Sequence, residues 1–274
     1  GKISLAALDP STQLMGYNLK GEQAESWCRL YNECVKEFID NYSERFTAMA
    51  AVPIQDPERA ARVLDHAVTQ LEFRGAYIAT KVNRRYYDSV DFDPFWAKAQ
   101  DLDVLVFMHP DNPAGIELMG SFGLRLVCGN PADTTFSLGL MIYSGVFDRF
   151  PNLKLCTCHG GGFFPYHVSR FDREFLTSKQ ATRRSDRPDA PRCTAAPSAY
   201  LKNLYFDTLV YDVETLDFLR RKVGPEHLML GTDFPYVLGD WMCVDKIKAL
   251  PCSEAEKNLI LEGNARKLLK ISVS

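Results

Sequence analysis

The segment LKLCTCHGGGFFPY, residues 153–166, sets the pattern for the whole chain. It runs an apolar, β-rich stretch into His159 and places three glycines directly behind that histidine. An apolar run of this length that ends in a turn predicts a buried strand. Two interpretations of the glycines are open: a tight turn after a core histidine, or a turn that lets another group approach the imidazole closely.

Segments of the same kind recur along the chain and alternate with helical patterns. The clearest helix covers 56–72, where Asp56 is placed to cap, Pro57 lies in the first turn, and an apolar stripe repeats every three to four residues. Strand alternating with helix predicts a parallel sheet with helices outside it. The predicted strands are 3–8, 46–52, 75–79, 103–109, 153–159, 204–210 and 227–233, and the other predicted helices cover about 21–44, 94–101, 132–149, 165–178, 213–223 and 253–269.

The number of strands predicts the fold. A closed (β/α)8 barrel has eight strands in about 250 residues, and the sequence offers seven. Because the chain opens directly on a strand, the absent one is most economically placed before residue 1, so we expect an α/β fold, a TIM-like barrel lacking its first strand. An open doubly wound sheet is the competing fold, but no Gly-rich nucleotide-binding fingerprint favours it. The Arg-rich stretch 178–192 is interpreted as a surface excursion, so 1–274 should form a single domain.

Composition excludes several classes of function. The 274 residues are 46% apolar and 24% charged, with 32 Lys and Arg against 35 Asp and Glu. No stretch interleaves basic and aromatic residues, so no nucleic-acid partner is expected. The longest apolar runs, such as 104–108, are far short of the roughly 20 residues of a membrane span. Eight scattered cysteines do not form a disulfide framework, and a cytoplasmic location is expected.

The motif Cys156, Cys158, His159 raises the question of a metal cluster. Within a strand, Cys-x-Cys puts both thiols on one face and the next residue on the other. A Cys/His zinc site is therefore not expected at this place.

Three predicted strands end in an ionisable residue, namely His109, His159 and Asp233. The carboxyl ends of barrel strands surround one mouth, so these side chains should converge there. Alternation with period two places His159 on the same face as Thr157 and Leu155. Two imidazoles and a carboxylate are ligands that zinc and related divalent ions accept, and they are also acid and base candidates.

Two further features follow from this arrangement. The glycines at 160–162 would let backbone and substrate come close to the His159 ring. The other three histidines, His66, His167 and His227, are interpreted as structural or solvated residues.

The motifs FMHP, CHGGGFFPYHVSRFDR, MLGTDFPY and NLILEGNARKLLKI resemble the metal-dependent amidohydrolase superfamily. They are closest to the branch of α-amino-β-carboxymuconate-ε-semialdehyde decarboxylase and the non-oxidative aromatic-acid decarboxylases, and the stretch 129–162 is particularly similar to it. The resemblance covers nearly the whole chain in the right order. It implies a metal-dependent carboxy-lyase that acts on an aromatic or unsaturated carboxylic acid.

The resemblance also implies roles for individual residues. His109 matches a metal ligand, Asp233 a metal-proximal ligand and proton handler, and His159 the catalytic acid/base. Arg170 stands where an arginine of the family reaches the neighbouring subunit's site to hold a substrate carboxylate, which implies a homodimer. A solvated helix residue is the alternative for Arg170. The implied cofactor is a divalent metal, Zn²⁺ first and Mn²⁺ second.

One feature of the family is absent from this sequence. The family carries a His-x-His or Glu-x-His pair on its first strand, and no such pair occurs here. Either the chain lacks that strand of a longer protein, or it cannot hold metal in the family way. We favour the first, because a barrel without one strand would expose two unpaired edges.

Two alternatives to decarboxylation are open at this stage. A metal-bound hydroxide could attack a lactone, an amide or an unsaturated acid, which would make the protein a hydrolase or hydratase. A barrel that has lost its metal shell could serve as a non-catalytic binding subunit.

Overall fold

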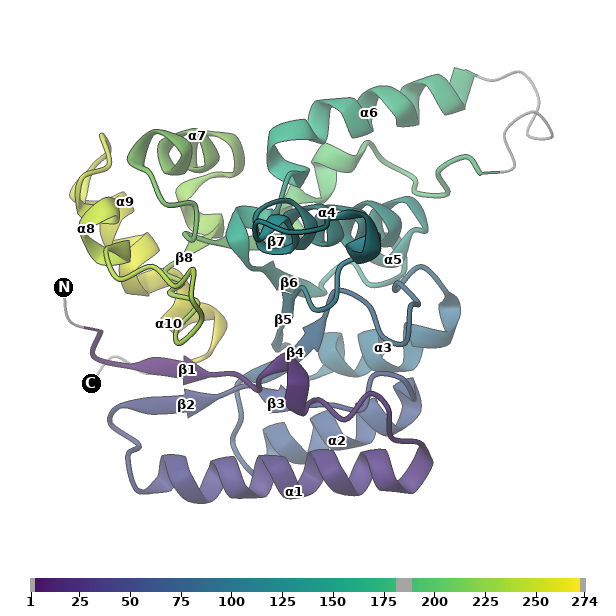
Figure 1. Ribbon diagram of the computed structural model, residues 1–274, viewed down its shortest axis with the longest axis vertical. Helices are drawn as coiled ribbons and strands as arrows, with labels where there is room; N and C mark the ends of the chain where they lie inside the picture. The colour runs from purple at the N-terminus through teal and green to yellow at the C-terminus, as the bar shows by residue number, and fades with distance from the viewer. Residues whose placement is uncertain (1–2, 181–188, 272–274) are drawn as a thin grey trace.

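The computed structural model describes residues 3–180 and 189–271, and its centre is a set of parallel strands (Figure 1). Six of them form one sheet in the order β3-β4-β5-β6-β7-β8, and β1 pairs with β2 in a second parallel sheet. The strands are β1 (Ala6–Leu8), β2 (Phe46–Ala48), β3 (Ala50–Ala51), β4 (Gly75–Ala79), β5 (Leu105–His109), β6 (Lys154–Thr157), β7 (Leu204–Asp207) and β8 (Leu228–Met229).

Helices follow the strands and surround them, as the alternating sequence pattern predicted (Figure 1). No helix in the described part of the chain is long and apolar enough to cross a membrane. Of the predicted surface excursion 178–192, residues 181–188 lie outside the described residues. The α-helices are α1 (Gly21–Asp40), α2 (Pro57–Thr69), α3 (Asp93–Asp101), α4 (Asn130–Tyr143), α5 (Val146–Arg149), α6 (Phe164–Gln180), α7 (Val213–Val223), α8 (Cys243–Lys248), α9 (Glu254–Asn258) and α10 (Asn264–Leu268).

All seven predicted strands are present, and the second of them divides in two. Residues 46–48 pair with β1, whereas 50–51 pair with β4, so the chain changes neighbour at Met49. Within 3–180 and 189–271 no strand pairing joins β8 to β1. The loops after these two strands nevertheless meet, because Ser11 Oγ and Tyr236 Oη are 3.3 Å apart. The strands therefore form a parallel α/β barrel wall that is open between β8 and β1.

The helix predicted at 56–72 is present as α2. The Asp56 carboxylate accepts a hydrogen bond from the Arg59 backbone N–H at 3.3 Å, and Pro57 occupies the first turn, as predicted. The helix ends earlier than predicted, and Glu72 has a left-handed φ of 59°, which a continuing helix does not allow. Its buried face is Ala60, Ala61, Val63, Leu64 and Ala67.

Glu25 links α1 to α2 through arginine side chains. Its carboxylate lies 2.8 Å from Arg59 Nη1, 3.1 Å from Arg62 Nη2 and 3.2 Å from Arg29 Nη2. Burial acts to raise the pKa of Glu25, but the hydrogen bonds from the arginines outweigh it and lower the pKa. We expect Glu25→Gln to reduce the free energy of unfolding by about 1 kcal/mol at neutral pH, as measured by urea denaturation.

The contribution of Glu25 should depend on pH in a defined direction. A pKa that is lower in the folded state stabilises above the pKa of the unfolded chain, and the effect is lost as pH falls through the folded pKa. The difference between wild type and Glu25→Gln should therefore close on acidification. Glu33→Gln, on an exposed position of the same helix, is the control and should change stability by less than about 0.5 kcal/mol. A difference that persists in acid would contradict the prediction.

Candidate metal centre

The three side chains predicted at the barrel mouth lie together. Asp233 Oδ1 is 3.3 Å from His109 Nε2, and Asp233 Oδ2 is 3.7 Å from His159 Nε2. The two imidazole rings have centroids 5.0 Å apart. His109 is the last residue of β5, His159 follows β6, and Asp233 follows β8. The carboxyl ends of three strands therefore bring two imidazoles and one carboxylate to a single point.

His109 is held with one nitrogen free to bind. Its Nδ1 lies 2.9 Å from the Pro110 carbonyl oxygen and donates to it, because a carbonyl oxygen can only accept. Nε2 is buried and has no hydrogen-bond partner. The rings of Tyr77 and Tyr236 stack against the imidazole, with centroids 6.2 and 6.0 Å away. A histidine fixed by its other nitrogen, with an unpartnered Nε2 beside a carboxylate, fits a divalent metal ion.

Asp233 supplies the negative charge of this centre. Burial acts to raise its pKa, but the nearby side chains of His109 and His159 outweigh burial and lower the pKa to about 2. The carboxylate is therefore ionised at neutral pH. An ionised carboxylate beside an imidazole that is held through its other nitrogen is a suitable pair of first ligands for a divalent cation.

The three glycines after His159 form a left-handed turn. His159 itself has φ 56°, and the φ values of Gly160, Gly161 and Gly162 are 59°, 80° and 63°. A Cβ on Gly162 would lie 2.1 Å from the Pro131 carbonyl oxygen. The glycines are thus required by the turn and by close packing against other parts of the protein. The expected close approach of backbone is present at Gly162, and the approach of substrate to the ring stays a prediction.

The predicted face of β6 was wrong. The register pairs Phe107 of β5 with Cys156 of β6, and period-two alternation puts Phe107 on the same face as His109. Cys156 therefore points to the barrel interior, and Thr157 points away from it. His159 reaches the interior through the left-handed turn after β6 and not through alternation along the strand.

The same turn corrects the expectation for the cysteines. Cys158 and His159 were expected on opposite faces, but Cys158 Sγ is 3.3 Å from His159 Nδ1. The ligand atoms of His109, Cys158 and His159 all lie within 4.8 Å of one another. The sequence pattern thus did not predict that the Cys158 thiol lies beside these two histidines.

Two acidic residues at the centre were missed. Asp207 ends β7 and is buried, and its Oδ1 accepts from the backbone N–H groups of Gly160 at 2.9 Å and Leu209 at 3.1 Å. Burial raises the pKa of Asp207, although His159 and these N–H groups oppose the shift. Asp207 therefore anchors the turn that carries His159. Asp207 could have been found from the sequence, because it is an acidic residue within the otherwise apolar predicted strand 204–210.

Asp9 is the second missed acid and follows β1. Asp9 as a whole residue is exposed. Its carboxyl group, however, is surrounded by protein, and this burial raises its pKa to about 6. The charge of His109 acts to lower that pKa, and the charge of Asp233 acts to raise it. Asp9 therefore stands near the same centre. Its position at the end of a predicted strand, like that of His109, was the signal.

The remaining predicted residues lie elsewhere. Arg170 is exposed on α6, and in the described part of the chain it makes no contact with His109, His159 or Asp233. The three histidines interpreted as structural are also outside the centre. His227, for example, pairs its Nδ1 with the Leu204 carbonyl oxygen at 2.8 Å and packs on Tyr205.

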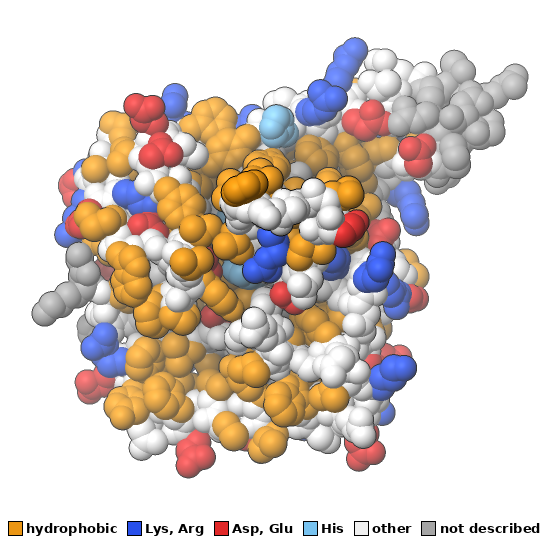
Figure 2. Space-filling view, in the orientation of Figure 1, with side chains coloured by type: hydrophobic (Ala, Val, Ile, Leu, Met, Phe, Trp, Pro, Cys, Tyr) orange, Lys and Arg blue, Asp and Glu red, His pale blue; other side chains and the backbone are white. Residues whose placement is uncertain are grey.

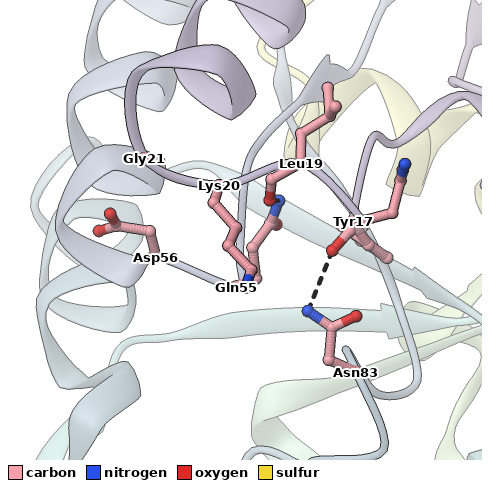
Figure 3. A pocket seen from close by; sticks show the side chains of 8 residues that line it. Tyr17, Leu19, Lys20, Gly21, Gln55, Asp56 and Asn83 are labelled. Carbon is pink, nitrogen blue, oxygen red and sulfur yellow. Dashed lines mark hydrogen bonds between the residues drawn. The ribbon is translucent and has the colours of Figure 1, made fainter.

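One face of the molecule carries many hydrophobic side chains (Figure 2). Figure 2 shows histidine and basic side chains near the middle of this face, among hydrophobic ones. A hollow of about 430 Å³ is lined by 17–21, Gln55, Asp56 and Asn83 (Figure 3). The side-chain amide of Gln55 holds the 9–21 loop in place, because Gln55 Nε2 donates to the carbonyls of Gly16 and Leu19. The hollow contains none of the residues of the metal centre.

Comparisons with known proteins agree with this geometry. The family model described as amidohydrolase matches residues 7–271. The chain is 30% identical to the 2-amino-3-carboxymuconate-6-semialdehyde decarboxylase of Dictyostelium discoideum, over 97% of this chain and 73% of that protein. It is 30% identical to the gamma-resorcylate decarboxylase of a Polaromonas species, over 91% and 78%.

A solved structure is similar over the same span. The dihydroxybenzoic acid decarboxylase of a Polaromonas species, with bound manganese and the inhibitor 2-nitroresorcinol, superimposes with a TM-score of 0.88. The identity is 27%, and the match covers 99% of this chain and 83% of that one. All three of these similar proteins carry the name of a decarboxylase.

Proposed function

The chain belongs to the amidohydrolase family, and we propose that it is a metal-dependent enzyme that removes CO₂ from an aromatic or unsaturated carboxylic acid without oxidation. The observation that carries this proposal is the meeting of His109, His159 and Asp233 at one end of the parallel strands. The matched relatives, which are named as decarboxylases of 2-amino-3-carboxymuconate-6-semialdehyde and of gamma-resorcylate, support the reaction class.

His109 Nε2 and the Asp233 carboxylate would hold the metal. A divalent ion bound there supplies Lewis acidity toward the oxygen atoms of the substrate. Asp233 suits the role of ligand better than that of acid, because its low pKa leaves it without a proton at neutral pH. The buried ring of Tyr77 and the more exposed ring of Tyr236 stack against His109 and would limit the access of water to its imidazole.

His159 is then the group that handles the proton. In the proposed reaction the proton passes from the His159 imidazolium to the carbon that bears the carboxylate. The bond from that carbon to the carboxylate carbon then breaks, its electron pair returns to the conjugated system, and CO₂ leaves. Asp207 positions His159 by accepting from the Gly160 N–H in the turn. General acid catalysis of this kind contributes about 10²–10⁴ in rate.

Several finer points are also part of the proposal. The metal is Zn²⁺ or Mn²⁺, and manganese is bound in a similar solved structure. Residues 1–274 form one domain, of which the family model matches residues 7–271. Arg170 is exposed on α6, where it could serve the site of a second copy in a homodimer that acts in the cytoplasm.

The test is CO₂ release from metal-loaded protein expressed from its complete reading frame. A panel of hydroxybenzoates and muconate-like acids is incubated with the protein, and both evolved CO₂ and the decarboxylated product are measured. We expect one equivalent of CO₂ for each acid consumed. Water uptake without gas would replace decarboxylation by hydrolysis or hydration on the same site. If a protein that holds one metal per chain gives neither CO₂ nor a hydrolysed or hydrated product, the proposal is overturned.

A further inference from the structure

The metal centre contains a sulfur atom as well as nitrogen and oxygen. Cys158 is a free cysteine with 2% of its surface exposed. Its Sγ belongs to the group in which the ligand atoms of His109, Cys158 and His159 lie within 4.8 Å of one another. Atoms bound to one zinc ion at about 2.0–2.3 Å must be about this close or closer to one another. The thiol is therefore within reach of an ion held by His109.

The backbone explains why the thiol points inward. The Cys158 N–H donates to the Met108 carbonyl at 3.3 Å, which continues the pairing of β6 with β5 by one residue beyond Thr157. Cys158 has extended dihedral angles, φ −74° and ψ 173°, and it therefore keeps the orientation of Cys156 two residues earlier. The chain leaves the strand direction only at the next residue, so the position of Sγ is fixed by sheet pairing.

We propose that Cys158 contributes its sulfur to the metal centre and makes this centre prefer zinc to manganese. The inference rests on the proposed function, since it concerns the metal of that same site. Thiolate ligands favour Zn²⁺, whereas centres built only from carboxylate, imidazole and water oxygen also suit Mn²⁺. On binding, a bond forms between Sγ and the metal, and the thiol proton leaves. That proton passes to water, and His159 Nδ1, 3.3 Å from Sγ, faces the thiolate that remains.

The experiment measures metal binding and not turnover. Wild type, Cys158→Ser, Cys158→Ala and the control Cys156→Ala are expressed from the complete reading frame and freed of metal. Cys156 is a matched control because its buried thiol lies on the same face of β6 but outside the ligand group. Each protein is loaded with Co²⁺ and examined for thiolate-to-cobalt charge-transfer absorption, and Zn²⁺ and Mn²⁺ affinities are measured by competition with a chelator.

We expect the sulfur absorption in wild type and in Cys156→Ala, and its loss in both Cys158 variants. Zn²⁺ affinity should fall by about 10- to 100-fold in those variants, while Mn²⁺ affinity changes by less than about threefold. Cobalt bound without sulfur absorption in wild type, or absorption that persists in Cys158→Ser, would overturn the inference and leave the proposed function intact. Failure of wild type to bind any of the three ions would overturn both.

Discussion

Asp233→Asn is expected to release the metal and to abolish CO₂ evolution. The substitution keeps the size of the side chain but removes the charge that both His109 and His159 face at 3.3 and 3.7 Å. Groups that only orient a metal ligand are worth about 10- to 100-fold in metal affinity. Removing the charge of a ligand should therefore lower metal affinity by at least about 100-fold. The measurement is metal per chain by elemental mass spectrometry after dialysis, together with CO₂ release.

The control for this substitution is Asp101→Asn, at the exposed end of α3. It makes the same chemical change far from the strand ends that carry the centre, and it should leave metal content and rate within about twofold of wild type. Thermal unfolding of both variants in the absence of metal separates loss of the ligand from loss of the fold. If Asp233→Asn retained one metal per chain at wild-type affinity, the assignment of Asp233 as a ligand would be wrong.

A metal centre at the ends of several strands distributes its ligands over distant parts of the sequence. His109 and Asp233 are brought together because parallel strands end at the same edge of the barrel wall. Each imidazole is then fixed locally, His109 by the Pro110 carbonyl and His159 by the turn that Asp207 anchors. A rigid wall with local anchors allows one site to be assembled from residues more than 120 positions apart.

The sequence was sufficient to predict this assembly at the level of strands. Alternating patterns located all seven strand segments, and α2 was recognised from Asp56, Pro57 and the apolar stripe. The rule that ionisable residues at strand ends meet at the mouth placed His109, His159 and Asp233 together. Applied without exception, the same rule would also have identified Asp9, which follows the predicted strand 3–8. Asp207 lies inside the predicted strand 204–210 and ends only the shorter observed strand β7.

The side-chain directions after β6 could not be predicted in the same way. Period-two alternation holds only while the backbone is extended, and His159 leaves that conformation with a φ of 56°. A non-glycine residue with positive φ is uncommon, so a sequence pattern gives no reason to expect it. That single dihedral angle turns His159 to the interior face, where sheet pairing already directs the Cys158 thiol.

His159→Gln is expected to separate proton transfer from metal binding. Glutamine preserves a hydrogen-bonding side chain of similar length but cannot exchange a proton near neutral pH. We expect kcat for CO₂ release to fall by about 10²–10⁴, while the chain keeps one equivalent of metal. His167→Gln is the matched control, because His167 lies exposed on α6, and it should leave both quantities unchanged.

The metal content of His159→Gln decides whether His159 transfers a proton or binds the metal, because the geometry is compatible with both roles. His159 Nε2 faces Asp233, while its Nδ1 faces Cys158 Sγ, and it is one of the three residues whose ligand atoms lie within 4.8 Å. Retention of metal with loss of turnover would assign it to proton transfer, since the proton donor contributes to the rate and not to the binding of the ion. Loss of metal together with turnover would assign it to the ligand shell instead, and Asp233 or a bound water would then have to move the proton.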